Sequence, residues 1–382
     1  MEAPRVALLN LAHDPGVREP ESTLQAFPVL TEFASGLSRA GAAVIVVQRH
    51  ASRAELARDG VSYVFVGGAG RGRPRSVDAC LPVLRRVAGL RPDVVHVHGL
   101  VFPLPVRALR RLLPEAALVV QHHGEGPWLG WRGALQRWGL AAADGFMFTA
   151  RGLAEPWRAR GVVGPAQPVF EVMEGSTGLV PVPRDQARGR VPLPGRPALL
   201  WVGRLHPVKD PLTLLEGLEL LLHDCPEAHL TMVFGEADQL GEVEARLRAS
   251  RRLRDATTLV GRVPHGELAW YYASADYYVA ASRREGSGFA LAEALGSGLV
   301  PIVTDIPSFA WMTDGGRLGG LWRPGDAADF ARVARAVLAR PREELSRAAV
   351  EQYRRRLSTE AIGRDALAVY RSVLERRGSR GR

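Results

Sequence analysis

The chain has 382 residues, with 50 Lys or Arg against 40 Asp or Glu and a formal net charge of +10. Hydrophobic residues make up 46% and charged residues 24%, which is ordinary for a soluble protein of two or three domains. No apolar run approaches the ~18 residues of a membrane span, and we expect no signal peptide. The two cysteines, Cys80 and Cys225, have no metal-ligand spacing and are expected to be buried thiols in a reducing cytoplasm.

The excess of positive charge favours an anionic partner, such as nucleic acid, acidic lipid head groups or a phosphorylated substrate. The basic residues are scattered, without the basic stripe and interleaved aromatic residues of a nucleic-acid-binding protein. We therefore expect no nucleic-acid partner. Lys209 is the only lysine, and the other 49 basic residues are arginine. Chemistry that requires a primary amine has this one candidate.

Short apolar runs alternate with helical patterns in two stretches of the chain, which is typical of βαβ units in parallel sheets. In the first stretch, strands are predicted at residues 6–9, 43–47, 63–66, 94–97, 117–120 and 145–148. Helices are predicted between them at residues 31–40, 77–89 and 106–113. In the second stretch, strands are predicted at residues 198–202, 230–234, 257–260, 277–279 and 300–303. These runs are almost continuously apolar, as in strands that are buried on both faces.

The pattern predicts an α/β fold with two Rossmann-like, doubly wound domains that face a cleft, followed by C-terminal helices. The first domain is expected at residues 1–165 and the second at residues 198–355. Residues 166–197 are rich in proline and are interpreted as a linker with one further strand at 169–173. A C-terminal helix at 356–382 is expected to cross back to the first domain and to end in a frayed basic tail.

The most informative segment runs from Arg283 to Gly298. It follows a predicted strand and opens a helix, where glycines let the backbone approach a ligand and unpaired amides can bind phosphate or sugar oxygens. Glu293 would lie about one turn into that helix, and its carboxylate could accept hydrogen bonds from two neighbouring hydroxyl groups. Glu285 would lie in the preceding loop, nearer the centre of the cleft.

An earlier segment, residues 202–211, also follows a strand and opens a helix. Asp210 suits the N-cap position and Pro211 the first helical position. Arg204 and Lys209 would project from this loop towards the same cleft. A departing diphosphate gains negative charge, and two cations fixed there would stabilise that change.

Together these segments resemble glycosyltransferase family 4, the retaining nucleotide-sugar transferases of the GT-B fold. The resemblance covers nearly the whole chain, and it rests on Arg204 with Lys209 five residues later, Glu285, Gly288-Phe289-Ala290, Glu293, Thr304-Asp305 and Pro324-Gly325-Asp326. It implies that Arg204 and Lys209 hold the donor diphosphate, that Glu285 meets the transferred sugar and that Glu293 holds the ribose. Gly288, Phe289 and Ala290 would complete the donor site.

Two histidine segments of the first domain also resemble this family. His123 matches the active-site histidine that the family places beside the sugar and the acceptor, and His98 matches a less defined position. Because side chains alternate along a strand, we expect at most one of His122 and His123 to face the cleft. His96 is expected to be buried in the sheet.

The chain departs from the family at residues 10–18, which contain one glycine where the family often has a Gly-Gly turn. The acceptor pocket is therefore expected to be specialised. The acceptor-side candidates are His13, His98 and Trp128. Trp128, Trp131, Leu135 and Trp138 recur at helical spacing, which favours a stripe that faces the core. The alternative is an acceptor wall or a contact with a membrane surface.

The resemblance implies a retaining glycosyltransferase that moves a sugar from a nucleotide-sugar donor to a glycan, a lipid-linked acceptor or a small molecule. His123, Glu285, Arg204 and Lys209 would be its catalytic residues. No Asp-x-Asp metal motif is present, so we expect no metal and no cofactor. We expect a cytoplasmic protein of polysaccharide or glycoconjugate biosynthesis, with peripheral contact to the anionic inner face of the membrane.

Three alternatives remain open from the sequence. The first is a nucleotide-sugar epimerase, and the second is a glycoside hydrolase that uses the two glutamates as an acid/base pair. The third is a non-catalytic protein that binds a nucleotide sugar or an anionic membrane. The donor base, the sugar, the acceptor, the linkage and the oligomeric state are not specified by the sequence.

Overall fold

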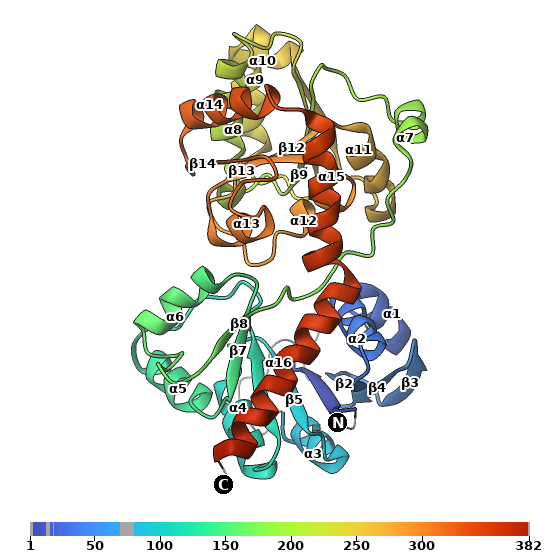
Figure 1. Ribbon diagram of the computed structural model, residues 1–382, viewed down its shortest axis with the longest axis vertical. Coiled ribbons are helices and arrows are strands. Elements are labelled where there is room, and N and C mark those ends of the chain that lie inside the picture. Colours follow the sequence, from blue (N-terminus) through green and yellow to red (C-terminus); the bar gives the residue numbers. More distant parts are fainter. Residues whose placement is uncertain (1–2, 13–15, 18, 69–79, 381–382) are drawn as a thin grey trace. The chain divides into compact units, whose positions relative to one another are not determined.

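The computed structural model describes residues 3–12, 16–17, 19–68 and 80–380. Its chain divides into two compact α/β units (Figure 1). The first unit contains residues 1–177 and 358–382, and the second contains residues 178–357. Each unit has its own sheet and its own hydrophobic core.

The described part of the first unit contains an eight-stranded sheet in the order β3-β4-β2-β1-β5-β6-β7-β8. All neighbouring strands are parallel except β3 and β4. The strands are β1 (Arg5–Asn10), β2 (Ala43–Arg49), β3 (Ala54–Arg58), β4 (Val61–Val66), β5 (Val94–His98), β6 (Ala117–Gln121), β7 (Gly145–Phe148) and β8 (Val169–Glu171). The helices are α1 (Pro20–Ala26), α2 (Pro28–Arg39), α3 (Leu81–Leu90), α4 (Pro103–Leu112), α5 (Gly130–Leu140), α6 (Glu155–Ala159) and α16 (Thr359–Arg380).

The second unit, which is described throughout, contains a six-stranded parallel sheet in the order β11-β10-β9-β12-β13-β14. The strands are β9 (Ala198–Gly203), β10 (His229–Phe234), β11 (Thr257–Gly261), β12 (Tyr277–Ala280), β13 (Val300–Thr304) and β14 (Gly320–Trp322). The helices are α7 (Arg184–Arg190), α8 (Pro211–Leu221), α9 (Leu240–Ala249), α10 (Arg251–Asp255), α11 (Leu268–Ser274), α12 (Phe289–Gly296), α13 (Pro307–Met312), α14 (Ala327–Leu338) and α15 (Arg342–Gln352). Parallel strands end at a common edge, so the loops after β9 and β12 share one side of this sheet.

The two parallel-sheet α/β units confirm the predicted fold class, and every strand predicted from an apolar run is present. Two strands were not predicted. β3 lies at an edge of its sheet with exposed charged side chains, so it lacks the apolar run of a buried strand. β14 has three residues, which is too short to give a pattern.

The segment expected to be a linker, residues 166–197, is partly built into both units. β8 pairs with β7 at the edge of the first sheet, and α7 packs against α11 in the second unit. The structure divides the units after Thr177, whereas the sequence pattern placed the first boundary at residue 165. The density of prolines therefore predicts where the chain passes from one unit to the other, but it does not predict how many residues form the linker.

The C-terminal helix α16 belongs to the first unit, where it packs against α2 and β6 (Figure 1). Gly36 on α2 and Gly363 on α16 permit the close approach. A Cβ atom on Gly363 would lie 2.1 Å from the carbonyl oxygen of Gly36. The basic tail was expected to be frayed, but the helix continues to Arg380.

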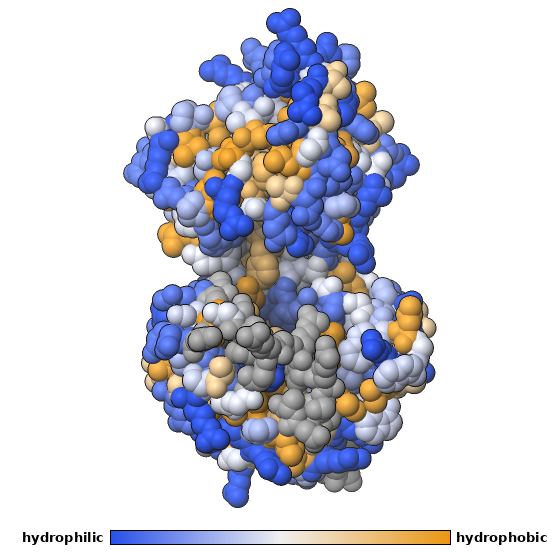
Figure 2. Space-filling view, turned by 180° about the vertical axis from the view of Figure 1, so that it is seen from behind, coloured by the Kyte–Doolittle hydropathy of each residue, from blue (hydrophilic) through white to orange (hydrophobic). Residues whose placement is uncertain are grey.

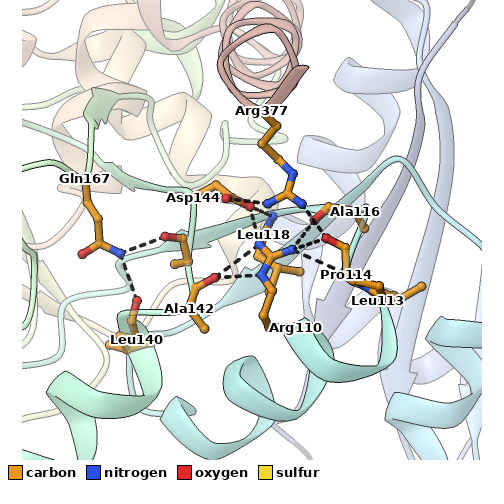
Figure 3. Close-up of polar contacts among 11 residues, drawn as sticks. Arg110, Leu113, Pro114, Ala116, Leu118, Leu140, Ala142, Asp144, Gln167 and Arg377 are labelled. Atoms are coloured by element: carbon orange, nitrogen blue, oxygen red, sulfur yellow. Dashed lines mark hydrogen bonds and ion pairs between the residues drawn. The ribbon is translucent and has the colours of Figure 1, made fainter. Parts of the chain in front are cut away.

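Arg377 of α16 is held by a partly buried charge network at the amino ends of β6 and β7 (Figure 3). Asp144 accepts hydrogen bonds from Arg377 at 2.8 Å, from Arg110 of α4 at 2.5 Å and from the amide of Leu118 at 2.8 Å. The Asp144 side chain is only 13% exposed. One carboxylate thus joins α4, β6 and α16.

Most of the face drawn in Figure 2 is hydrophilic, and hydrophobic residues reach the surface in groups on each unit. Among the described residues, no helix combines the length and the apolar character needed to cross a membrane.

We expect Asp144→Ala to lower the free energy of unfolding by about 3 kcal/mol, because it leaves the guanidinium groups of Arg110 and Arg377 without their counter-charge. Glu55→Ala is the matched control, since the Glu55–Arg86 ion pair of the same unit is exposed. Its effect should be within about 0.5 kcal/mol. Urea unfolding followed by circular dichroism measures both variants. An Asp144→Ala midpoint equal to that of Glu55→Ala would contradict this account.

Candidate functional site

Lys209 and Glu285 meet at the carboxyl end of the second sheet. Lys209 ends the 3-10 turn Pro207–Lys209 after β9, and Glu285 lies in the loop between β12 and α12. The ammonium Nζ forms an ion pair with Oε1 of Glu285, and the hydroxyl of Ser282 donates to the same oxygen at 2.7 Å. The two charged side chains are 20% and 14% exposed. The structure therefore brings together two predicted site residues that are 76 positions apart.

A second ion pair links the same two loops. Arg283 Nη2 lies 2.8 Å from Oδ2 of Asp210, and the Arg283 amide donates to the Val208 carbonyl at 2.8 Å. Asp210 occupies the N-cap position of α8 with a positive φ of 48°, but its side chain does not cap a helix amide. Its carboxylate instead accepts from Arg283 and, at 2.9 Å, from the Thr213 hydroxyl. The residue predicted as a helix cap thus also holds the loop of Lys209.

Arg204 lies in the loop after β9, and its side chain is 53% exposed. Its guanidinium Nη1 lies 3.4 Å from Oε2 of Glu236, in an exposed ion pair. Such a pair contributes little to stability. Little stability is therefore lost when the Arg204 guanidinium leaves Glu236 to bind another anion.

Glu293 lies on α12, and its side chain is only 7% exposed. Oε1 lies 2.7 Å from Nε2 of His265, and Oε2 accepts from the hydroxyl of Tyr272 at 2.8 Å. The hydrogen bond to Glu293 raises the pKa of His265. Burial and the Glu293 charge raise the pKa of Tyr272 well above 10, so this hydroxyl remains a donor. The His265 ring is 60% exposed, so the partner of Oε1 lies at the surface, whereas Tyr272, the partner of Oε2, is buried.

Gly288 is the N-cap residue of α12 and has a positive φ of 72°, and a Cβ atom there would lie 2.9 Å from the Phe309 ring. Both observations require glycine at this turn. Phe289 and Ala290 form the first positions of α12 and are partly exposed. The backbone amides at this helix start are suited to an anion.

The first unit contains a cavity of about 420 Å³ at the carboxyl end of its sheet. Its lining combines apolar and polar residues. The apolar ones include Phe27, Val29, Leu30, Val101 and Phe102, and the polar ones include Asn10, His98, His123, Glu125 and Glu174. A ligand with both a carbon skeleton and hydroxyl groups would match such a lining.

His123 is the centre of a polar chain in this cavity. Its Nδ1 forms an ion pair with Glu174, and its Nε2 lies 2.9 Å from Nδ1 of His98. The amide of His123 donates to Oε2 of Glu125 at 2.7 Å, and the other oxygen of that carboxylate accepts from the Leu100 amide. Glu174 and Glu125 thus orient both the ring and the backbone of His123.

The neighbouring histidines have opposite pKa shifts. Burial lowers the pKa of His123, but the charge and hydrogen bond of Glu174, together with the Glu125 charge, outweigh it and raise the pKa overall. Burial, with the charges of His96 and His123, moves the pKa of His98 well below 6.5. Burial also lowers the pKa of His96 to about 3. Near neutral pH, His98 is therefore a neutral acceptor for the Nε2–H of His123.

The other acceptor-side candidates of the first unit are not among the described residues that line this cavity. His122 stacks on Phe148 with ring centroids 4.9 Å apart and does not line the cavity, so only His123 of this pair faces it. The described residues that line the cavity do not include Trp128, whose amide donates to Gln136 at 2.8 Å. His13 lies outside the described residues.

Sequence reasoning missed the residues that hold the predicted ones in place. These are Ser282, Arg283, His265, Tyr272, Glu125 and Glu174. Glu174 alone had a usable signal, because it follows a predicted strand and so belongs to the same sheet edge as His98 and His123. The others act through contacts that no local pattern encodes.

Two family models match the chain. The model "Glycosyltransferase Family 4" matches residues 28–167, and "Glycosyl transferases group 1" matches residues 196–340. Together they match well over half of the chain.

Curated relatives match the chain over part of their length. The chain is 29% identical to the GDP-mannose:cellobiosyl-diphosphopolyprenol alpha-mannosyltransferase of Xanthomonas campestris, over 65% of this chain and 64% of that protein. It is 32% identical to the D-inositol 3-phosphate glycosyltransferase 1 of Catenulispora acidiphila, over 53% of this chain and 50% of that protein. The match therefore spans half to just under two thirds of these relatives.

A solved structure matches the fold over almost the whole chain. The sucrose-phosphate synthase of Thermosynechococcus elongatus has a TM-score of 0.70 and 19% identity, and the match covers 98% of this chain and 100% of that one. This likeness shows a shared fold.

Glu174→Gln should lower the pKa of His123, because it removes the charge that outweighs the effect of burial. In the wild type, the raised pKa of His123 stabilises the fold. This stabilisation is complete at pH values below 6.5 and is lost as the pH rises through the pKa of His123 in the folded protein. NMR titration of labelled histidine measures the shift. Glu171→Gln, three residues earlier, is the control and should leave the pKa unchanged. An unshifted His123 in Glu174→Gln would refute the assignment.

Proposed function

Because the chain belongs to glycosyltransferase family 4, we propose that it transfers a sugar from a nucleotide-sugar donor to an acceptor hydroxyl. Its two parallel-sheet α/β units have the GT-B fold. We further propose that the transfer retains the anomeric configuration and needs no metal ion. The bond between the anomeric carbon and the diphosphate oxygen breaks, a bond to the acceptor oxygen forms on the same face, and the hydroxyl proton is released with the nucleoside diphosphate.

The paired Lys209 and Glu285 are the observation that carries this proposal. In the free protein each satisfies the charge of the other, and Ser282 holds the carboxylate in place. A donor diphosphate would take the ammonium of Lys209 as its counter-ion, which leaves Glu285 to accept from a hydroxyl of the sugar. Arg204 and the amides at the start of α12 would supply further positive charge as the diphosphate leaves.

Glu293 would hold the ribose of the donor. Tyr272 fixes one carboxylate oxygen from the protein interior, so the ribose would bind at the oxygen that His265 reaches from the solvent side. A buried carboxylate that is already oriented loses little freedom on binding. This geometry supports a fixed nucleotide position.

The acceptor would bind in the cavity of the first unit. Glu174 keeps a proton on Nδ1 of His123, which leaves Nε2–H to donate to an acceptor oxygen in place of His98. The apolar residues that line the cavity would contact the carbon skeleton of the acceptor. The relatives act, by their names, on a polyprenol-linked sugar and on inositol 3-phosphate, so glycan, lipid-linked and small-molecule acceptors are all to be tested.

The geometry does not favour an acid/base pair of glutamates, as in a glycoside hydrolase. Glu285 is neutralised by Lys209, and Glu293 is buried with both oxygens engaged. Incubation with nucleotide sugars in the absence of acceptor distinguishes the remaining alternatives. An isomerised donor sugar would indicate an epimerase, and binding without turnover across an acceptor panel would indicate a binding protein.

Lys209→Ala should reduce turnover at saturating donor by about 10²–10³-fold, because it removes a cation that acts on the leaving diphosphate. Arg335→Ala, which removes an exposed guanidinium of the same unit, should leave the rate unchanged. An unchanged rate for Lys209→Ala would exclude the leaving-group role.

Lys209→Arg keeps the charge and changes the geometry from a compact ammonium to a planar fork. A clear loss of turnover is expected, since the compact Nζ of the single lysine pairs with the same Glu285 oxygen to which Ser282 donates. Near-normal activity would show that charge alone suffices.

Glu293→Gln should weaken nucleotide binding about tenfold or more, because a hydrogen bond to a charged group is worth about 1.5–3 kcal/mol. Isothermal titration with UDP, GDP and ADP measures the dissociation constants and identifies the preferred base. Glu267→Gln is the control, as this exposed carboxylate pairs with Arg190. Full affinity in a folded Glu293→Gln variant would exclude the ribose assignment.

A further inference from the structure

Helix α5 of the first unit directs large apolar side chains outward. Trp131 and Trp138 are 74% and 46% exposed, Ala134 is also exposed, and Leu135 is half-buried. These four residues have the i, i+3, i+4, i+7 spacing of one helix face. The opposite face buries two glycines and a glutamine, with Leu140 as its large apolar residue. An ordinary helix of a soluble protein has the reverse arrangement.

This orientation is fixed by the buried face. A Cβ atom on Gly133 would lie 2.6 Å from the Trp128 carbonyl oxygen, and one on Gly139 would lie 2.4 Å from that of Pro103. Between them, the Gln136 side chain accepts from the Trp128 amide at 2.8 Å and donates to the Leu100 carbonyl at 3.0 Å. Rotating the helix to bury its tryptophans would break these contacts. The core-facing interpretation of the Trp131–Trp138 stripe is therefore wrong.

The apolar surface extends beyond this helix face. Leu129, just before α5, is 70% exposed, and Leu112, at the end of the neighbouring α4, is 42% exposed. Among the described residues, four of the six large apolar side chains with such exposure belong to α4, α5 or the residue before α5. Exposed apolar side chains gathered in this way indicate an interaction surface.

Arginines surround the two tryptophans. The guanidinium of Arg107 lies 4.9 Å from the ring centre of Trp138, and that of Arg132 lies 5.5 Å from the ring centre of Trp131. Arg111 and Arg137 are exposed on the same two helices. The sequence has no acidic residue in 103–112 or in 126–143. The surface is therefore both apolar and positively charged.

We propose that this tryptophan–arginine surface, formed by Leu112, Leu129, Trp131 and Trp138 with Arg107, Arg111, Arg132 and Arg137, docks on an anionic lipid bilayer. Tryptophan rings settle at the level of the head groups, and arginines beside them bind lipid phosphates. A second copy of the chain is a poor occupant, because the same surface on two copies would bring arginines against arginines. The proposal is independent of the proposed transferase activity, since it concerns no residue of the donor or acceptor sites.

Co-sedimentation of the full chain with vesicles tests the proposal. We expect binding to vesicles of equal parts phosphatidylcholine and phosphatidylglycerol, weaker binding to phosphatidylcholine alone, and loss of binding between about 0.1 M and about 1 M salt. Trp131→Ser/Trp138→Ser and Arg132→Glu/Arg137→Glu should each lower the partition coefficient about tenfold or more. Thermal melting checks that each variant is folded.

Matched controls lie in the second unit. Leu220→Ser changes another exposed apolar residue, and Arg251→Glu/Arg254→Glu reverses two exposed arginines. Both should bind vesicles as the wild type does, apart from the small effect of net charge. Brominated lipids should quench wild-type tryptophan fluorescence, and Trp131→Phe/Trp138→Phe should abolish most of that quenching.

Three results would overturn the proposal. The first is wild-type protein that remains in the supernatant with the anionic vesicles at low salt. The second is equal loss of binding in the control and surface variants, which would indicate a response to net charge alone. The third is a dimer in light scattering that Trp131→Ser/Trp138→Ser dissociates, which would make a second copy the occupant.

Discussion

The adjacency of β9 and β12 is the constraint on which the candidate donor site depends. Tyr277 and Tyr278 pair with Leu199 and Leu200, so the two strands end side by side and their loops meet. Two ion pairs, Lys209–Glu285 and Asp210–Arg283, then hold the loops together. A parallel sheet gathers its carboxyl-end loops at one edge, whatever their separation in sequence. This strand order is sufficient to bring the ammonium of Lys209 and the carboxylate of Glu285 into contact.

In the first unit the candidate site also lies at the carboxyl edge of the sheet, but histidines and a glutamate take the place of the two ion pairs. His98, His123 and Glu174 follow or end β5, β6 and β8, and their side chains form one chain of contacts. Burial alone would leave both imidazoles neutral. One carboxylate beside His123 reverses the pKa shift of that ring and leaves that of His98 lowered. Two adjacent histidines thereby become a donor and an acceptor, as recognition of a hydroxyl group requires.

Packing, and not hydrophobic pattern, decides the orientation of α5. Its glycines allow contact with the backbone of Trp128 and Pro103, and Gln136 satisfies two buried backbone groups. Losing these contacts would leave buried polar groups unpaired, which costs about 1–3 kcal/mol for each group. The exposed face is consequently available for another role, and the arginines beside it favour an anionic partner.

The sequence by itself determined the two α/β units, the strands with apolar runs, the loops that contain Lys209 and Glu285, and the helix that contains Glu293, because apolar runs and glycine turns are local signals. Only the tertiary structure decided which charges pair, which histidine faces the cavity and which face of α5 is buried. These outcomes depend on residues far apart in the chain, such as Glu174 with His123 or Arg377 with Asp144. Their energies come from burial and mutual distance, which exist only after the strands have been ordered into a sheet.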